Sequence, residues 1–520
     1  MTGKRCTAAG VERFCGSFAA GLAAVLLFAL AAASLFVRMD LVDPTVQVEY
    51  KTLRLSTTLP ELLAIIALAA ALLGLCRLLQ NCTQKRALLF IGAAAAAEFG
   101  LALVWSYCKP VFPAHDQFLV WQMAKALVDR NFDGYPPDSY EWSYFQAFPY
   151  QGIMAVFLSA FVRLFGFYGE ALRAYAVFCS LCAALCLLAL CALAKQLGAA
   201  PRVQVLCAVL CLLFLPLPLY ASFVYGTLPA PALALWGGYG VVRFCKEGRL
   251  RWLSLPLLLF PLACMAYQSA RIFTIAAALA LLFAGLRQGG HGAVRCTLAA
   301  VAAVAWPVLF LALVRRYFYS QVPIPASTGA PALATVLMGV RADIGFGPGG
   351  YDGTNWTLYW ECGGDAQAAS AVALQKIGEA LREPGKVVFF LKKTAWQWLD
   401  PWFEGLSMNG PAIAEETAGA LAKALAGGVL FAPVELLLRA MLTAVYFFAG
   451  VGTLTLRREK QGAVWAQLLT VAFLGGFFFQ LAWETKGRYC FPFFLFLLPS
   501  AAVGLGSVAQ RLADRKNTAK

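Results

Sequence analysis

Long apolar runs separated by short polar turns extend over most of the chain, and their lengths predict membrane-spanning helices. The first run, at about 14–37, follows Lys4, Arg5 and Arg13. A cleaved signal peptide also has a basic start, but its apolar core is only about 7–15 residues long, so we predict an uncleaved first span. Further spans are predicted at about 59–80, 87–107, 173–195, 203–222, 229–245, 252–268, 271–287, 296–315, 429–450, 462–481 and 489–507. The pattern therefore predicts an all-α polytopic membrane protein with about 12 transmembrane helices.

The apolar run at 152–167 decides the topology. It has only 16 residues and contains Arg163, which makes it short for a span. If it stays on the outer side, the predicted cytoplasmic segments hold 21 Lys and Arg residues, and the short outer segments hold six. If it crossed, the basic turn at 243–251 would face outward. The positive-inside rule favours the topology without a crossing, with both termini in the cytoplasm.

Two long outer segments result, at 108–172 and 316–428. Both are too polar and too rich in Gly and Pro to span, and we expect interfacial helices within them. The predicted organisation has four parts: a two-span extension at 1–86, a transmembrane core at 87–315 that includes the first outer loop, an extracytoplasmic region at 316–428, and C-terminal helices with a cytoplasmic tail at 429–520. Because spans tolerate few charged groups, we expect the chemistry on the outer segments.

Composition supports a cell-membrane protein and excludes several other classes. Of the 520 residues, 61% are hydrophobic and 13% charged, against about 45–50% and about 25% in soluble proteins. The net charge of +15 accompanies no soluble basic domain, so no nucleic-acid partner is predicted. Only two histidines, His115 and His291, are present, which argues against histidine-rich metal centres and Ser–His catalysis. No GxxxxGK[ST] phosphate loop occurs, so the chain is not an ATP-driven pump by itself.

Asp116 is the main catalytic candidate of the first outer segment. It follows Pro113 and precedes an amphipathic stretch at 118–127, so we expect it at the start of a surface helix near the membrane plane. One interpretation is an N-cap, because Asp is favoured at that position. The other is a general base at the lipid–water boundary, where burial would make it competent near neutral pH. His115 beside it is a weaker candidate for binding substrate or lipid phosphate.

A second group of candidates lies in WETKGRYCFP at 483–492, the predicted outer turn between the last two spans. It places Glu484, Lys486 and Arg488 within about one helical turn of the bilayer edge. These charges either snorkel at a helix end, or Lys486 and Arg488 hold a lipid phosphate, because Arg presents a rigid fork that matches phosphate oxygens.

The second outer segment and two outer turns add further candidates. A Gly-rich run at 345–356 is expected to be a flexible loop that either closes over a site or only joins elements. The aromatic run at 386–403 is typical of an interfacial helix, and its lysines, Lys393 among them, meet either a lipid phosphate or bulk anionic lipid. Tyr225 and Arg271 lie in outer turns and are candidates for binding substrate or lipid phosphate.

The order and predicted sidedness of four segments resemble the GT-C superfamily of integral-membrane glycosyltransferases, especially the bacterial branch related to protein O-mannosyltransferases and aminoarabinose transferases. The segments are AHDQF, FPYQGIMAVFLSAFVRLFG, FVYGTLPAPAL and WETKGRYCFPFF, and the resemblance covers about 87–507. It implies a GT-C-like fold, a polyprenyl-phosphate-linked sugar donor, and a catalytic acidic residue in the first large outer loop, which is Asp116 here. Many members have an acidic residue in the next outer turn, where this chain has Thr227. That departure puts metal dependence in doubt, and no cofactor is expected with certainty.

The implied reaction is consistent with the available residues. A lipid phosphate leaves readily as an anion, so transfer needs a base for the acceptor and cations for the phosphate, but no second carboxylic acid. The expected partners are the polyprenyl-phosphate sugar, an extracytoplasmic envelope acceptor and the lipid bilayer. Two other classes stay open: a lipid or solute transporter with the outer segments as a lid, and a structural envelope subunit without chemistry.

Overall fold

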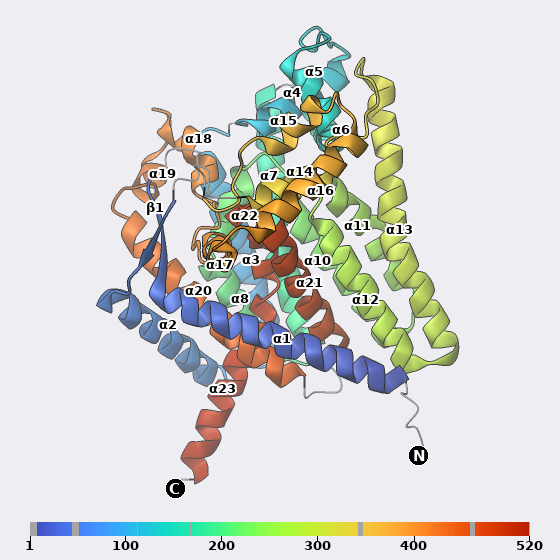
Figure 1. Ribbon diagram of the computed structural model, residues 1–520. Coiled ribbons are helices and arrows are strands. Elements are labelled where there is room, and N and C mark those ends of the chain that lie inside the picture. Colours follow the sequence, from blue (N-terminus) through green and yellow to red (C-terminus); the bar gives the residue numbers. More distant parts are fainter. Residues whose placement is uncertain are drawn as a thin grey trace.

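The computed structural model describes residues 8–43, 51–111, 113–166, 168–341, 347–457 and 463–518. These segments are mostly helical. In Figure 1 most of the long helices run between two ends of the molecule, whereas α1 lies obliquely across them. We call the end where α1 begins and α23 ends the terminal end, and the opposite end, where α4, α5 and α15 lie, the loop end.

Within the described ranges, seven helices are long and apolar enough to cross a membrane. They are α1 (Ala8–Phe36), α2 (Leu59–Leu78), α3 (Gln84–Tyr107), α7 (Tyr168–Gln196), α12 (Ala270–Gln288), α13 (Gly290–Gln321) and α20 (Phe431–Leu456). Three bent pairs raise the number of candidate spans to as many as ten. The pairs are α5 (Tyr140–Ala147) with α6 (Pro149–Phe165), α8 (Pro201–Leu213) with α9 (Pro216–Leu219) and η1 (Tyr220–Ser222), and α22 (Gly487–Leu495) with α23 (Leu498–Thr518). The prediction of an all-α multi-pass membrane protein is confirmed, whereas the count of about 12 spans stays a prediction.

The remaining helices fall into two groups. Three lie at the other predicted span positions: α10 (Pro229–Glu247), α11 (Ser254–Ala266), which follows η2 (Leu250–Leu253), and α21 (Ala463–Ala482). The others lie in the two long segments that were predicted not to span. They are α4 (Asp116–Asp129), α14 (Ala332–Val340), α15 (Thr354–Glu361), α16 (Ala366–Arg382), α17 (Lys386–Trp398), η3 (Ser407–Asn409), α18 (Gly410–Ala414) and α19 (Ala420–Leu425).

Helix α6, which contains most of the ambiguous run at 152–167, follows α5 after a bend of 102°. Phe157 and Phe161 of α6 pack against Phe178, with ring centroids 6.5 and 5.2 Å apart. Phe178 belongs to the first half of α7, whereas the last residue of α7, Gln196, accepts a hydrogen bond from Lys246 at the end of α10. Helix α6 therefore packs on the first half of α7, and the expectation that the run at 152–167 does not cross stays a prediction.

A two-stranded antiparallel hairpin, formed by β1 (Val37–Leu41) and β2 (Lys51–Leu55), is the one sheet among the described residues and was not expected from the sequence. Its strands have only five residues each, too few for the alternation of polar and apolar positions to be distinctive. Asp40 of β1 pairs with Arg439 of α20 at 2.7 Å, which fixes the hairpin to the helical bundle.

Helices α20 and α23 approach each other at two glycines. A Cβ atom at Gly452 would lie 1.8 Å from the carbonyl oxygen of Ser500, and one at Gly504 would lie 1.9 Å from that of Phe448. Contacts this short leave no room for any side chain, so glycine is required at both positions.

We expect Gly452→Ala and Gly504→Ala each to destabilise the protein by about 1–3 kcal/mol, because the helices must separate to admit a methyl group. The measurement is the thermal unfolding temperature of the purified protein in detergent. Gly100→Ala in α3 is the matched control, since a Cβ there meets nothing within 4 Å. Equal unfolding temperatures for the Gly452 and Gly100 variants would contradict the packing described here.

Candidate functional site

Asp116 occupies the first position of α4, and His115 occupies the cap position before it. His115 has a φ of 50° and its side chain makes no capping hydrogen bond. Asp116 is therefore not the N-cap, and the capping interpretation of the sequence is wrong. Both side chains are exposed, so the burial expected for Asp116 is also not found. A carboxylate in the first turn is still favoured by the positive end of the helix dipole.

The carboxylate of Asp116 lies near tyrosines from three other parts of the chain. Burial, followed by the negative charge of Asp116, raises the pKa of Tyr144 on α5 well above its usual range. The same two causes raise the pKa of Tyr225, after η1, and raise that of Tyr351, before α15, to about 12. The Tyr144 hydroxyl makes no hydrogen bond of standard geometry, although Asp116 is close enough to affect it. Asp116 therefore faces neutral phenol groups.

Aromatic contacts connect this region to α22. The Tyr225 hydroxyl donates a hydrogen bond to Gln151 Oε1 at 2.7 Å, which attaches it to the start of α6. Its ring packs edge-on against Tyr267 with centroids 5.8 Å apart, and Tyr267 lies 6.3 Å from Tyr489. The tyrosines thus form a continuous aromatic wall from the neighbourhood of Asp116 to α22.

Lys486, at the cap position of α22, and Arg488, in its first turn, reach the same wall. Glu484 accepts a hydrogen bond from the Tyr489 hydroxyl at 3.1 Å and pairs with Lys486 at 3.1 Å. Lys486 Nζ lies 5.9 Å from the centre of the Tyr351 ring, and the Arg488 guanidinium lies 5.3 Å from that of Tyr489. We call Asp116, Tyr144, Tyr225, Tyr351, Glu484, Lys486, Arg488 and Tyr489 the outer site.

Tyr225 is the residue that links the two charged parts of the outer site. After burial, the largest influences on its pKa are the negative charge of Asp116, which raises it, and the positive charge of Arg488, which lowers it. Tyr225 therefore lies within electrostatic range of both. The candidate base and the candidate phosphate-binding cation are 372 positions apart in the numbering, from 116 to 488, yet they share this neighbour.

A buried ion cluster lies beneath the 484–488 turn. Lys51 of β2 pairs with Asp400 at 2.9 Å and with Glu404 at 3.1 Å, and all three side chains are at most 4% exposed. Glu404 also accepts the backbone N–H of Gly487, the first residue of α22. Burial alone would raise the pKa of Glu404, but Lys51, Arg488 and Lys486 outweigh it and hold that pKa below its usual value. The cluster fixes the start of α22 and, with it, Lys486 and Arg488.

The Gly-rich run and Lys393 support the same turn from the other side. Thr485 donates its hydroxyl to the carbonyl of Pro348 at 2.5 Å and its N–H to that of Gly349 at 2.8 Å. Lys393 of α17 is fully buried and donates to the carbonyls of Gly339 and Trp483. Burial lowers the pKa of Lys393 to about 7. The predicted contact of Lys393 with lipid phosphate is therefore wrong for this structure, because its ammonium group faces backbone oxygens in the interior.

The structure thus brings together four of the candidates, Asp116, Tyr225, Lys486 and Arg488. His115 adjoins Asp116 and is exposed. Arg271 lies exposed in the first turn of α12, and in the described part of the chain its side chain makes no hydrogen bond or ion pair with the outer site. Sequence reasoning missed Lys51, Asp400 and Glu404. The run LDPWFEG carried a signal for two of them, since its carboxylates lie among aromatic residues.

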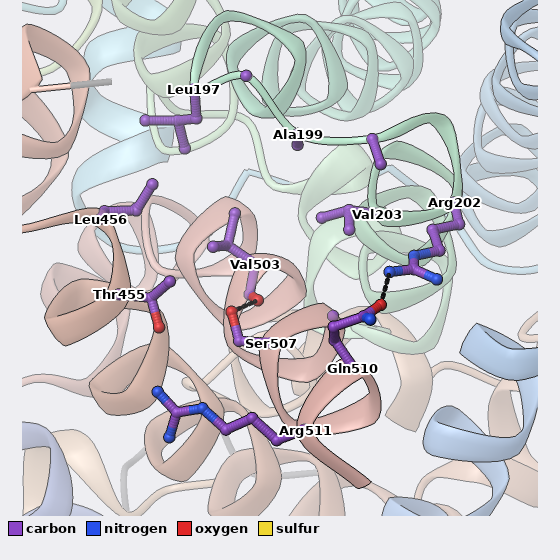
Figure 2. Close-up of a pocket in the computed structure, with 13 residues that line it drawn as sticks. Leu197, Ala199, Arg202, Val203, Thr455, Leu456, Val503, Ser507, Gln510 and Arg511 are labelled. Carbon is purple, nitrogen blue, oxygen red and sulfur yellow. Dashed lines mark hydrogen bonds between the residues drawn. The ribbon is translucent and has the colours of Figure 1, made fainter. Parts of the chain in front are cut away.

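Two further features concern ligand binding, namely possible metal-binding groups and a cavity. Within the described ranges, no three His, Cys, Asp or Glu side chains gather as a metal-binding group. A cavity of about 350 Å³, shown in Figure 2, is lined by the start of α8, the end of α20 and part of α23. None of the outer-site residues lines it, so it is a separate feature.

Comparison with known protein families gave no match, and comparison with curated protein sequences gave none either.

We expect Lys51→Met to destabilise the protein by about 3–5 kcal/mol, because it leaves two buried carboxylates without their cation. The measurement is the thermal unfolding temperature. Arg54→Met is the matched control on the same strand, since its side chain is 68% exposed and its ion pair with Asp40 is worth at most about 1 kcal/mol. Similar losses in the two variants would show that Lys51 is not a structural anchor.

The lowered pKa of Glu404 also predicts a dependence of stability on pH. A carboxyl group whose folded pKa is depressed stabilises the folded state fully above its unfolded pKa, about 4.3, and loses that contribution as pH falls through the folded value. We expect the unfolding temperature of the wild-type protein to fall more steeply below about pH 4.3 than that of Glu404→Gln, which cannot titrate there. Parallel pH profiles would contradict this role.

Proposed function

We propose that the protein is an integral-membrane glycosyltransferase that moves a sugar from a polyprenyl-phosphate donor to an acceptor on the extracytoplasmic side of the cell membrane. The observation that carries the proposal is that Asp116 and Arg488 both lie within electrostatic range of Tyr225. The Arg488 guanidinium lies 6.0 Å from the centre of the Phe223 ring, and that ring lies 6.0 Å from the ring of Tyr225. A base and a phosphate-binding cation near one another are what this transfer needs, because the phosphate is already a good leaving group.

In the proposed reaction, Asp116 accepts the proton of the acceptor hydroxyl. The oxygen attacks the anomeric carbon, and the bond between that carbon and the phosphate oxygen breaks from the opposite face, with inversion. The bonding electrons leave with the polyprenyl phosphate, whose negative charge is stabilised by Arg488 and Lys486. The tyrosine wall supplies neutral hydroxyl groups and aromatic faces against which a sugar can pack.

The surroundings of Arg488 support its assigned role. Arg488 Nη1 contacts the sulfur of Met408 at 3.1 Å, and a thioether is a weak acceptor that a phosphate oxygen readily replaces. Glu404 and the start of α22 hold the backbone of this turn, so the guanidinium is positioned by the fold before donor binds. The positive-inside distribution supports a membrane orientation with both termini cytoplasmic and the outer site extracytoplasmic.

We expect Asp116→Asn to reduce sugar transfer by about 10²–10⁴-fold, because a positioned general base contributes that much to the rate. The measurement is release of polyprenyl phosphate from labelled polyprenyl-phosphate hexose and pentose donors in proteoliposomes. Asp133→Asn, an exposed carboxylate of the same loop, is the matched control and should stay within about tenfold of wild type. Full transfer by Asp116→Asn would exclude this mechanism, and donor translocation without transfer by the wild type would favour a transporter.

We expect Arg488→Lys to weaken donor use by about tenfold or more, because an ammonium group cannot bind two phosphate oxygens through a planar fork. The KM for the donor should rise while the unfolding temperature changes little, since the positive charge near Glu404 is kept. Arg316→Lys, at an exposed position near the end of α13, provides the control. An unchanged KM in Arg488→Lys would remove Arg488 from the phosphate site.

A further inference from the structure

The cavity at the terminal end has a strongly asymmetric lining (Figure 2). One part of its wall is apolar and includes Leu197, Val203, Leu456 and Val503. Another part carries the polar side chains Arg202, Thr455, Ser507, Gln510 and Arg511. Its volume of about 350 Å³ is within the range of small-molecule sites, about 300–1,000 Å³.

The charge of the lining is positive. Arg202 and Arg511 are both lining residues, and none of the lining residues is acidic. Figure 2 shows the two arginines on either side of Gln510. Arg202 Nη2 donates to Gln510 Oε1 at 2.9 Å, while its buried Nε has no hydrogen-bond acceptor. The nearest carboxylate on α23, Asp514, is one turn further along and accepts from Gln510 Nε2 at 3.0 Å.

The start of α8 adds to this positive potential. Helix α8 begins at Pro201 beside the cavity, and no side chain caps it, since the cap position is held by Ala200. Pro201 has no N–H, and the N–H groups of Val203 and Gln204 donate to the carbonyl of Ala200, so the helix contributes chiefly the positive end of its dipole, which favours an anion. Two guanidinium groups and the dipole of a helix start thus act on one open cavity.

The cavity lies at the ends of helices that are candidate membrane spans. It lies where α20 ends and α8 begins, at the terminal end of apolar helices that are candidate spans or parts of them. A ligand here therefore meets apolar helix surface on one side and polar turn residues on the other. Basic pockets between spans on the cytoplasmic side bind the head groups of acidic lipids.

We propose that this cavity binds an anionic phospholipid of the leaflet at the terminal end, with its phosphate held by Arg202 and Arg511 and the start of its acyl chains against Leu197, Leu456 and Val503. A free phosphate ester would use the same cations but leave the apolar wall uncovered. The arrangement therefore favours the lipid. The inference concerns a site separate from the outer site and does not depend on the proposed sugar transfer.

The test is thermal unfolding of the detergent-purified full chain with added phosphatidylglycerol, phosphatidylcholine or inorganic phosphate. We expect phosphatidylglycerol to raise the unfolding temperature and the other two to have little effect. In Arg202→Gln/Arg511→Gln, the phosphatidylglycerol concentration that gives half of the shift should rise about tenfold or more, because two charge-assisted contacts are lost.

Two further variants separate binding from general damage. Ser507→Leu keeps both arginines but fills the cavity, so it should also lose the response to phosphatidylglycerol. Arg86→Gln removes an exposed positive charge at the start of α3, outside the cavity, and should respond as the wild type does. An unchanged response in Arg202→Gln/Arg511→Gln would overturn the proposal. An equal response to inorganic phosphate and phosphatidylglycerol would also overturn it, because the site would then not select a lipid.

Discussion

The contact of Lys51 with Asp400 and Glu404 is the interaction on which the geometry of the outer site depends. Two carboxylates in an apolar surrounding are tolerable only with a cation beside them, and Lys51 is buried with them. The Glu404 carboxylate also accepts a hydrogen bond from the backbone N–H of Gly487. A strand near the N-terminus, a loop near residue 400 and a helix near the C-terminus are thereby held in one arrangement.

Glycines make this arrangement possible at close range. A Cβ at Gly487 would lie 2.8 Å from Asp400 Oδ2, and one at Gly339 would lie 2.5 Å from the carbonyl oxygen of Trp483. The backbone at Gly487 can therefore approach the Asp400 carboxylate on one side of the turn, and the backbone at Gly339 can approach Lys393 on the other side. The polypeptide around Lys486 and Arg488 is fixed by buried polar contacts, while their side chains extend to the tyrosine wall.

The two polar regions of the molecule differ in how they are built. The outer site gathers residues from α4, α5, the turn after η1, the loop before α15, and the start of α22 with the turn before it, and it contains both signs of charge. The cavity at the terminal end is lined by residues near helix ends and has positive charge only. Mixed charge close together suits acid–base chemistry, whereas an uncompensated positive lining suits binding of an anion.

The sequence alone determined the membrane class and the positions of the helices, because long apolar runs have no other stable form in a bilayer. It also singled out Lys486 and Arg488, since the predicted short outer segments hold only six Lys and Arg residues, and Asp116, since it is the first carboxylate of the first long outer segment. It could not determine that Asp116 follows the cap, that Lys393 turns inward, or that Lys51 joins Asp400 and Glu404. The contact of Lys51 with Glu404 joins positions 353 apart, the contacts of Lys393 join positions 54 and 90 apart, and the cap position depends on the backbone conformation at His115. Neither periodicity nor local propensity determines these features. Only the tertiary structure decided them, because the free energy of a buried charge depends on which partner the fold places beside it.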